Sequence, residues 1–393
     1  MRADERQPQT NRSTSRRTPK TGSLFDQFQE DTHVRYRPSP EILAALPRDR
    51  WLLTSLLQKA IRRGRVDYAV AAADSLVLLE PDYVAGRLPI IAYEDIGVAD
   101  LPALLWTKQV AATIPVQTEA QRRKIATAVA GHLADSPKSR TACDIVCLTD
   151  CSTEARHYGD ELCRRGLADW IHAATAPTEP LIKRAVAWRF VLGLSAGGKR
   201  PNVAVGAGRQ GALATVAGAM QLPTALVAAI HVGTGTHNLH TALALAHELV
   251  YSTSVEAIKR GNSSPVSGRV AGGVMLCALD MYTRAGRTAY RRVLSSSPRL
   301  MAMLRRYAPR GHPVECVGLL MFHIEGSALS RRVESSASLA VQAEVENAEA
   351  ISVGFESPEG ALKVRTWLRH HRQVIDAARE QVIRAVHTAS SAP

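Results

Sequence analysis

The sequence predicts a mainly α-helical protein, and three observations support this fold class. Ala, Leu and Val are abundant while aromatic residues make up only 5% of the chain, and this composition favours Ala-rich helices over an aromatic β-sandwich. Apolar residues recur at helical spacing in many segments. Only short stretches with breakers such as Gly64 separate these segments, which is typical of arrays of packed helices.

The 393 residues exceed the usual size of one domain, so two packed units are expected. Residues 1–40 are rich in Arg, Ser, Thr, Gln and Pro without an apolar period, which predicts a disordered basic arm. Residues 41–175 are expected to form a helical module, and residues 176–390 a second, basic, Ala/Gly-rich domain. That domain is expected to be mostly helical. An α+β alternative stays open because residues 203–205 and 317–324 could be strands.

In chain order, the first predicted helix begins near Leu52, with Leu56, Leu57 and Ile61 on one face and Lys59 on the opposite face. Further helices of the first module are predicted over residues 66–79, 83–92, 101–114, 119–134 and 140–148. The tail, residues 353–387, is again amphipathic and predicts a last helix.

Charge directs the functional prediction towards DNA. The formal net charge is +13 and the isoelectric point is about 9.8, and such a surplus attracts polyanions, of which nucleic acid is the commonest inside a cell. The start of the chain lacks the apolar core of a signal peptide, and no uninterrupted apolar stretch predicts a membrane span. Six cysteines in a chain of this length do not predict a disulfide framework. We therefore expect a cytoplasmic protein without a membrane partner.

Three ordered motifs in the first half carry a resemblance. Residues 55–64 read SLLQKAIRRG, residues 91–100 read IAYEDIGVAD, and residues 136–139 read SPKS. This succession, within about residues 51–140, resembles the helical C-terminal region of the RarA/MgsA family of replication-associated AAA+ ATPases. The resemblance implies a clamp-loader-like helical module and a replication or AAA+ protein as a partner. It also implies that Glu94 and Asp95 cap or pair structurally.

The chain departs from that family in one important respect. It contains no G-x-x-x-x-G-K-[ST] sequence, so the loop and lysine that hold ATP phosphates are missing. We expect no ATPase activity and no cofactor. G-A-G-R-Q-G at residues 206–211 has the spacing of a dinucleotide fingerprint, but no acid follows about 20 residues later. A close-packed glycine turn is the favoured interpretation there.

An arginine-rich segment is the clearest feature of the second half. Between Asp280 and residue 310 there is no lysine and no second carboxylate, but there are eight arginines: Arg284, Arg287, Arg291, Arg292, Arg299, Arg305, Arg306 and Arg310. Residues 276–294 are predicted to form one helix, on which Asp280 and the first three of these arginines fall within about 60°. Either Asp280 pairs with Arg284 on a solvated face, or the arginines contact DNA phosphates and present Asp280 as a catalytic carboxylate.

Two smaller groups are further candidates. His323 and Glu325 follow an apolar run and would share a face at a strand end, directed into a cleft; a structural histidine is the alternative. Lys199 and Arg200 follow two glycines and would form a phosphate-contacting loop or an ordinary exposed turn.

No metal site is predicted. Among His231, His237, His240 and His247, only the middle two share close helical spacing, and no H-E-x-x-H sequence occurs. Cysteines recur every fourth residue at positions 143, 147 and 151, which favours a buried helical stripe over a cluster site.

The sequence thus predicts a DNA-binding protein acting in replication, recombination, repair or defence against foreign DNA, without an ATPase of its own. The alternative is a DNA-processing enzyme. A glycosylase that excises a normal or modified base is favoured over a nuclease, because a glycosylase needs no nucleotide cofactor and often no metal. Asp280, His323 and Glu325 are its candidate catalytic residues. A third possibility is a scaffold that recruits a separate ATPase through the first module.

Overall fold

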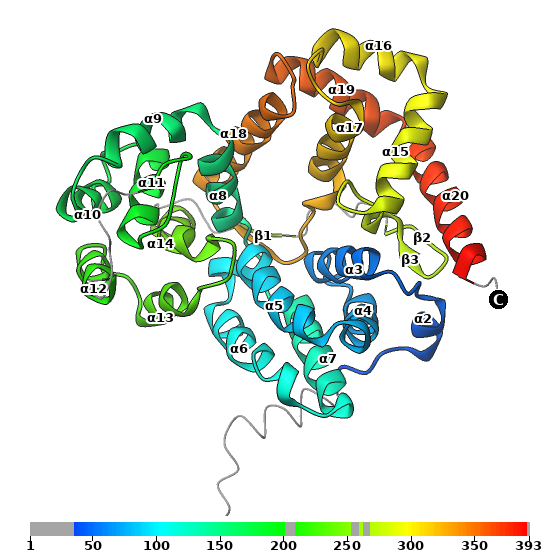
Figure 1. Cartoon of the computed structure of the whole chain (residues 1–393), viewed down its shortest axis with the longest axis horizontal. Coiled ribbons are helices and arrows are strands. Elements are labelled where there is room, and N and C mark those ends of the chain that lie inside the picture. Colours follow the sequence, from blue (N-terminus) through cyan, green and yellow to red (C-terminus); the bar gives the residue numbers. More distant parts are fainter. Residues whose placement is uncertain (1–34, 201–208, 253–258, 262–267, 391–393) are drawn as a thin grey trace, which may run out of the picture.

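The structure is a computed structural model that describes residues 35–200, 209–252, 259–261 and 268–390. It confirms a mainly α-helical fold with a minor β part (Figure 1). Helices α2 to α8 are Pro40–Ala45, Arg50–Arg62, Val66–Leu79, Pro81–Ile91, Leu101–Ala111, Glu119–Asp135 and Thr141–Cys151. Their order matches the helices predicted for the first module. Asp49 caps α3 by accepting a hydrogen bond from the backbone N–H of Leu52 (2.8 Å), as short polar residues do at helix starts.

The rest of the described chain is also helical. Helices α9 to α14 are Thr153–Leu162, Leu167–Thr175, Leu181–Val191, Arg209–Ala219, Thr224–Val232 and Leu243–His247. Helices α15 to α20 are Arg284–Ser296, Pro298–Tyr307, Pro313–Met321, Ser336–Ser352, Pro358–His370 and Arg372–Ser390. The tail therefore forms two helices rather than one. Within the described ranges, no helix is long and apolar enough to cross a membrane.

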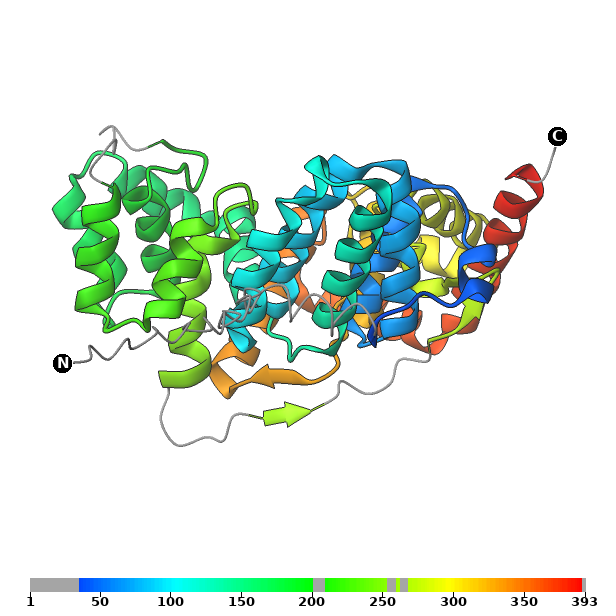
Figure 2. The same ribbon diagram turned by 90° about the horizontal axis from the view of Figure 1, so that it is seen from below.

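Short elements connect these helices. The π-helices are η1 (Ala92–Ile96), η5 (Glu248–Ser252) and η7 (Phe322–Gly326), and the 3-10 turns are η2 (Gly97–Ala99), η3 (Ile114–Val116), η4 (Leu239–Ala242) and η6 (Leu276–Ala278). Strands β1 (Lys259–Gly261) and β4 (Arg332–Glu334) pair antiparallel, as Figure 2 shows, and so do β2 (Val270–Ala271) and β3 (Val274–Met275).

Two hydrophobic cores hold the molecule together. The first packs α3, α4 and α7 against α15, α17, α19 and α20 from the far end of the chain. The second joins α8 to α10, α11, α13, α14 and α18. Figure 1 shows α9–α14 as a lobe on the left and α15, α16 and α20 on the right. Each core thus combines segments from both sides of the predicted boundary between residues 175 and 176, where α10 packs against α11.

Two local predictions in the second half were wrong. The helix predicted over residues 276–294 begins only at Arg284, because the Thr283 hydroxyl caps it by accepting a hydrogen bond from the Gly286 N–H (2.9 Å). Asp280 therefore precedes the helix and does not lie on the arginine face. Residues 317–324 are not a strand either, since they form the end of α17 and the start of η7. His323 and Glu325 consequently point in different directions.

Several predictions fall on residues that the structure does not describe. These are residues 1–34 of the predicted arm, residues 203–205 of the possible strand, and residues 206–208 of the glycine-rich motif. At the end of the arm, Tyr36 is buried, and its hydroxyl donates to an Asp135 carboxylate oxygen (2.8 Å).

Candidate functional site

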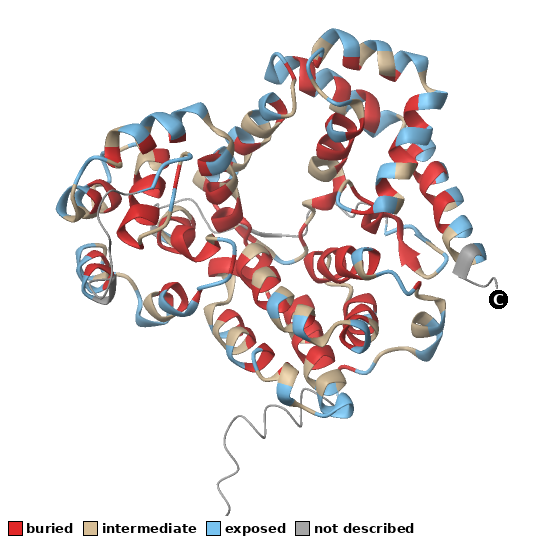
Figure 3. Cartoon of the chain, viewed as in Figure 1, coloured by how far each residue is buried: buried red, intermediate tan, exposed pale blue. Residues whose placement is uncertain are grey.

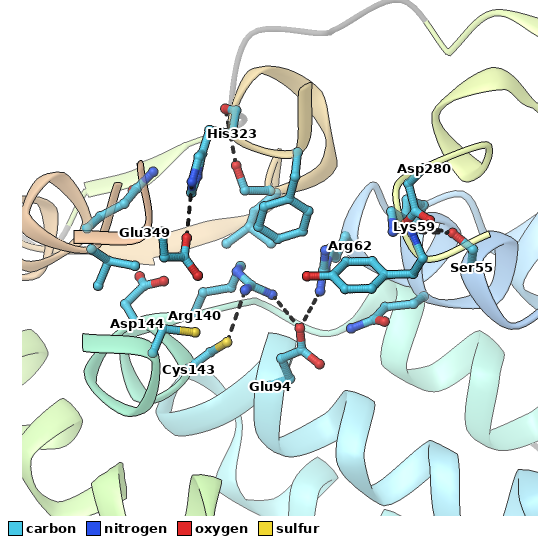
Figure 4. A pocket seen from close by; sticks show the side chains of 18 of the residues that line it. Ser55, Lys59, Arg62, Glu94, Arg140, Cys143, Asp144, Asp280, His323 and Glu349 are labelled. Carbon is cyan, nitrogen blue, oxygen red and sulfur yellow. Dashed lines mark hydrogen bonds and ion pairs between the residues drawn. The ribbon is translucent and has the colours of Figure 1, made fainter. Parts of the chain in front are cut away.

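A cavity of about 410 Å³ lies between the two cores. Its lining comes from α3, α5, η1, α8 and the residue before it, the loop that precedes α15, η7, the segment from η7 to the start of β4, and α18. Figure 4 shows Asp144, Cys143 and Glu349 towards one end of it, Lys59, Ser55 and Asp280 towards the other, and Glu94 in between. Its volume is in the range of small-molecule sites.

The floor of this cavity is an ion network built from the first two motifs that carry the resemblance and from Arg140, which directly follows the third. The π-helix η1 places Glu94 and Asp95 side by side, opposite Arg62 of α3 and Arg140, which directly precedes α8. Arg62 contacts an oxygen of Asp95 at 2.6 Å and one of Glu94 at 2.5 Å. Arg140 contacts Asp95 at 2.7 Å and Glu94 at 3.0 Å. Gln58 donates to the other Asp95 oxygen (3.1 Å). Each buried charge is thereby compensated.

This network keeps Glu94 ionised. Burial by itself raises the pKa of Glu94, but the guanidinium groups of Arg62, Arg140 and Arg87 outweigh it and hold that pKa well below its ordinary range. The Glu94 side chain remains 17% exposed, and the residue lines the cavity. The carboxylate is therefore accessible to a ligand as an anion.

Asp144 of α8 lines the same cavity, but its pKa is shifted in the opposite direction to that of Glu94. Burial raises its pKa to about 6, although Arg140 and Arg332 lower it, and the nearby Glu349 raises it further. Across the described residues, no side chain forms a hydrogen bond or ion pair with the Asp144 carboxyl group. A carboxyl group with such a pKa can donate a proton near neutral pH.

Asp280, the predicted catalytic carboxylate, lines the cavity but is fully engaged. Its Oδ2 forms an ion pair with Lys59 and accepts a hydrogen bond from the Ser55 hydroxyl (3.0 Å). Its Oδ1 accepts the backbone N–H of Tyr282 (3.0 Å). The predicted pairing with Arg284 does not form because the helix starts after Asp280. The Asp280 carboxylate thus ties the loop before α15 to α3.

His323 and Glu325 are separated by the π-helix. His323 lines the cavity, and its Nε2 lies 3.0 Å from an oxygen of Glu349. Glu325 is buried outside the cavity lining and pairs with Arg379 and, at 3.2 Å, with Arg372. Arg379 also donates to the Tyr290 hydroxyl (2.9 Å). Glu325 therefore anchors the C-terminal helix α20, whereas His323 belongs to the cavity.

Aromatic side chains surround the cavity. The Phe322 ring lies under the guanidinium groups of Arg62 and Arg140, at 5.4 and 5.6 Å. Trp51 and Tyr83 pack edge to face at 6.4 Å, and the guanidinium group of Arg50 lies over both rings. Trp51 is 56% exposed and Tyr282 is 67% exposed although both line the cavity, so they lie where it opens to solvent.

The predicted phosphate-contacting residues lie outside the cavity. All eight arginines from Arg284 to Arg310 are exposed, and Figure 3 shows the exposed outer faces of α15 and α16. Among them, Arg287 lies 3.8 Å from Glu315 and Arg292 lies 3.5 Å from Gln381. Lys199 and Arg200 are exposed in the other lobe, near α9, where Lys199 pairs with Asp160 (2.9 Å). The structure does not bring these two groups together.

Comparison with known families, with curated proteins and with solved structures gives no match for this chain. The described residues also contain no group of three His, Cys, Asp or Glu side chains arranged to hold a metal ion.

Sequence reasoning identified Asp280 and His323 but missed Asp144 and Glu349 as cavity residues. Asp144 lies within the helical segment whose cysteine spacing predicts a buried stripe, and Cys143 and Cys147 of this stripe line the cavity. A polar residue at a core-facing position of an apolar helix was the available signal. Glu349 lies on α18 among several carboxylates, and nothing in its local sequence distinguishes it.

Proposed function

We propose that this protein binds DNA and hydrolyses the N-glycosidic bond of a nucleotide that is extruded into the cavity. The observation that carries this proposal is that one cavity holds two carboxyl groups whose pKa values are shifted in opposite directions. Glu94 is held ionised, whereas the pKa of Asp144 is raised to about 6. In glycosidic hydrolysis, two carboxyl groups whose environments move their pKa values apart usually serve as the acid and as the ionised group that stabilises the developing charge.

The two groups would divide the reaction between them. Asp144 donates its proton to the departing base as the bond between C1′ and the base nitrogen breaks. The Glu94 carboxylate stabilises the positive charge that develops on the sugar, and the attacking water, whose oxygen bonds to C1′, releases its proton to solvent. The products are the free base and an abasic sugar. Asp144 recovers a proton from solvent.

Asp280 has a positioning role in this proposal. Both of its oxygens are occupied by Lys59, Ser55 and the Tyr282 N–H, so a nucleophilic attack by this carboxylate would break three interactions. Its contacts hold Lys59 and Tyr282 at the edge of the cavity. His323 and Glu349 would contact the substrate at the end that Asp144 occupies.

The affinity for DNA would come from the surface. The net charge of +13 and the exposed arginines of α15 and α16 suit contacts to phosphates. The resemblance to the RarA/MgsA family, whose members are associated with replication, supports a place near replicating or repaired DNA.

The proposal is tested by incubating the protein with duplexes that carry normal or modified bases, with and without a chelator, followed by alkali treatment and a gel. Alkali-sensitive sites that form in the presence of chelator are expected from the wild type. Strand breaks without alkali that require a divalent ion would instead indicate a nuclease. DNA binding without either product would favour a binding protein, and the absence of binding would contradict the proposal.

The roles of the two carboxyl groups are separated by substitution. Asp144→Asn and Glu94→Gln should each lower the excision rate by about 100-fold or more, which is the usual contribution of a general acid and of a preorganised stabilising group. Asp160→Asn is the matched control, since this carboxylate lies on the surface beside Lys199, and it should leave the excision rate unchanged. Normal excision by Asp144→Asn would remove Asp144 from the mechanism.

A further inference from the structure

Tyr282 differs from every other aromatic residue of the cavity lining. Trp51 and Tyr83 pack against each other and against Arg50, and Phe322 packs against Arg62 and Arg140. For the Tyr282 side chain, in contrast, the described residues provide no hydrogen bond, ring contact or cation–π contact. Large aromatic side chains are normally explained by the contacts that they make inside the protein. The Tyr282 ring makes none of these contacts, so packing does not explain it.

The ring nevertheless stands among the charges of the cavity. Burial raises the pKa of the Tyr282 hydroxyl, and the charges of Glu349, Asp280 and Glu94 raise it further. Tyr282 lines the cavity together with these three groups, which lie at its opposite ends and in its middle (Figure 4), while 67% of the residue stays exposed. Its hydroxyl keeps its proton and remains a hydrogen-bond donor.

The backbone of Tyr282 is fixed although its ring is not packed. Its N–H donates to Asp280 Oδ1 (3.0 Å), and the next residue, Thr283, caps α15. The first turn of α15 packs closely on this loop, because a Cβ at Gly286 would lie only 2.0 Å from the Asp280 carbonyl oxygen. The loop therefore presents the ring from a rigid support, which lowers the entropy lost when a ligand packs against it.

We propose that Tyr282 is the stacking surface for the nucleobase that enters the cavity, and that Asp280 is the residue that positions it. This inference rests on the proposed function. A flat heteroaromatic ring is the ligand that a free tyrosine face suits best, because base–aromatic stacking tolerates any base.

The test uses a DNA duplex with 2-aminopurine in a mismatch, whose fluorescence is quenched when it stacks on an aromatic ring. A dye on the duplex end reports binding by anisotropy. At equal saturation, the bound probe should be several-fold brighter with Tyr282→Ala than with the wild type, and Tyr282→Phe should restore the quenching. In base excision, Tyr282→Ala should raise KM about ten-fold, from the usual strength of base–aromatic stacking. The decrease in kcat should be smaller.

Tyr158→Ala is the matched control, because Tyr158 lies on α9 outside the cavity and packs against His157 and Lys183. It should leave both fluorescence and KM unchanged. Equal fluorescence and equal KM for Tyr282→Ala and the wild type would overturn the inference while leaving the proposed function intact. If the wild type neither bound the duplex nor excised a base, the proposed function itself would fail.

Discussion

The Lys59 ammonium group and the Asp280 carboxylate form a buried ion pair, although they lie 221 positions apart in the chain. Their side chains are only 3% and 6% exposed. Ser55 donates to the same carboxylate oxygen and also lies 3.3 Å from the Lys59 nitrogen. The pair joins α3 of the first half to the loop that leads into α15 of the second half, beside the cavity.

Breaking this pair from one side should destabilise the fold. Asp280→Asn or Lys59→Met leaves one buried charge without its partner, which typically costs about 3–5 kcal/mol in the free energy of unfolding. The double variant Lys59→Met/Asp280→Leu should recover much of this loss. Urea unfolding followed by circular dichroism measures all three. The exposed pair of Lys363 and Glu359 is the control, and Glu359→Gln should change nothing measurable. A similarly small effect of Asp280→Asn would contradict the prediction.

Asp144 should make the stability of the protein depend on pH in a specific direction. Its pKa is raised to about 6 in the folded state, above its value of about 4 in an unfolded chain. The folded state therefore binds this proton more tightly. The stability that results is fully present below about pH 4 and lost as the pH rises through about 6, by on the order of 3 kcal/mol. Asp144→Asn should abolish this component in urea titrations across that range. An unchanged pH dependence would show that Asp144 titrates normally.

The same group should shape the pH profile of base excision. If protonated Asp144 is the general acid, kcat should fall about ten-fold for each pH unit above about 6. The residual activity of Asp144→Asn should lack this alkaline limb. A single-turnover series on one duplex substrate measures both profiles. A flat profile of the wild type between about pH 6 and 8 would be incompatible with this assignment.

The arginine face of α15 should contribute to DNA affinity in a salt-dependent manner. Arg284, Arg287 and Arg291 are exposed on that helix, and each phosphate contact releases counterions. Changing all three to Gln should lower the slope of log affinity against log salt by about 3 in magnitude. The matched control removes the same charge from the other lobe, at the exposed residues Arg156, Arg164 and Arg165. Anisotropy titrations should show a smaller change for this control, and equal effects of the two triple variants would argue against a defined face.

Gly286 should be required for the loop that holds Asp280. A Cβ at this position would lie 2.0 Å from the Asp280 carbonyl oxygen and 2.5 Å from its amide nitrogen, so the loop must shift in Gly286→Ala. Such overpacking typically costs about 1–3 kcal/mol. Gly211→Ala is the matched control, because it lies in α12 with no atom within 4 Å of the added Cβ. There the substitution should be neutral or stabilise by up to about 1 kcal/mol. Thermal unfolding compares the two, and equal Tm values would contradict the prediction.

The sequence by itself determined the helical class and most of the first-half helices. Helix α4 spans residues 66–79, as predicted, because Ala-rich periodic segments bounded by Gly or Pro contain their own start and stop signals. The exposure of the arginine face was also predictable, since a face of consecutive like charges cannot be buried. Local chemistry is sufficient for both properties.

Tertiary structure alone decided how the cavity is assembled. Asp280 was predicted on the arginine face because its spacing fits a helix, but the Thr283 cap starts α15 later. Lys59, 221 positions away in the chain, holds Asp280 instead. His323 and Glu325 diverge because η7 is a π-helix rather than a strand. The protonation states of Glu94 and Asp144 depend on burial and on the guanidinium groups of Arg62 and Arg140. The causes of these outcomes are contacts between residues far apart in the chain and the loss of solvent around buried groups. No local sequence pattern encodes either of them.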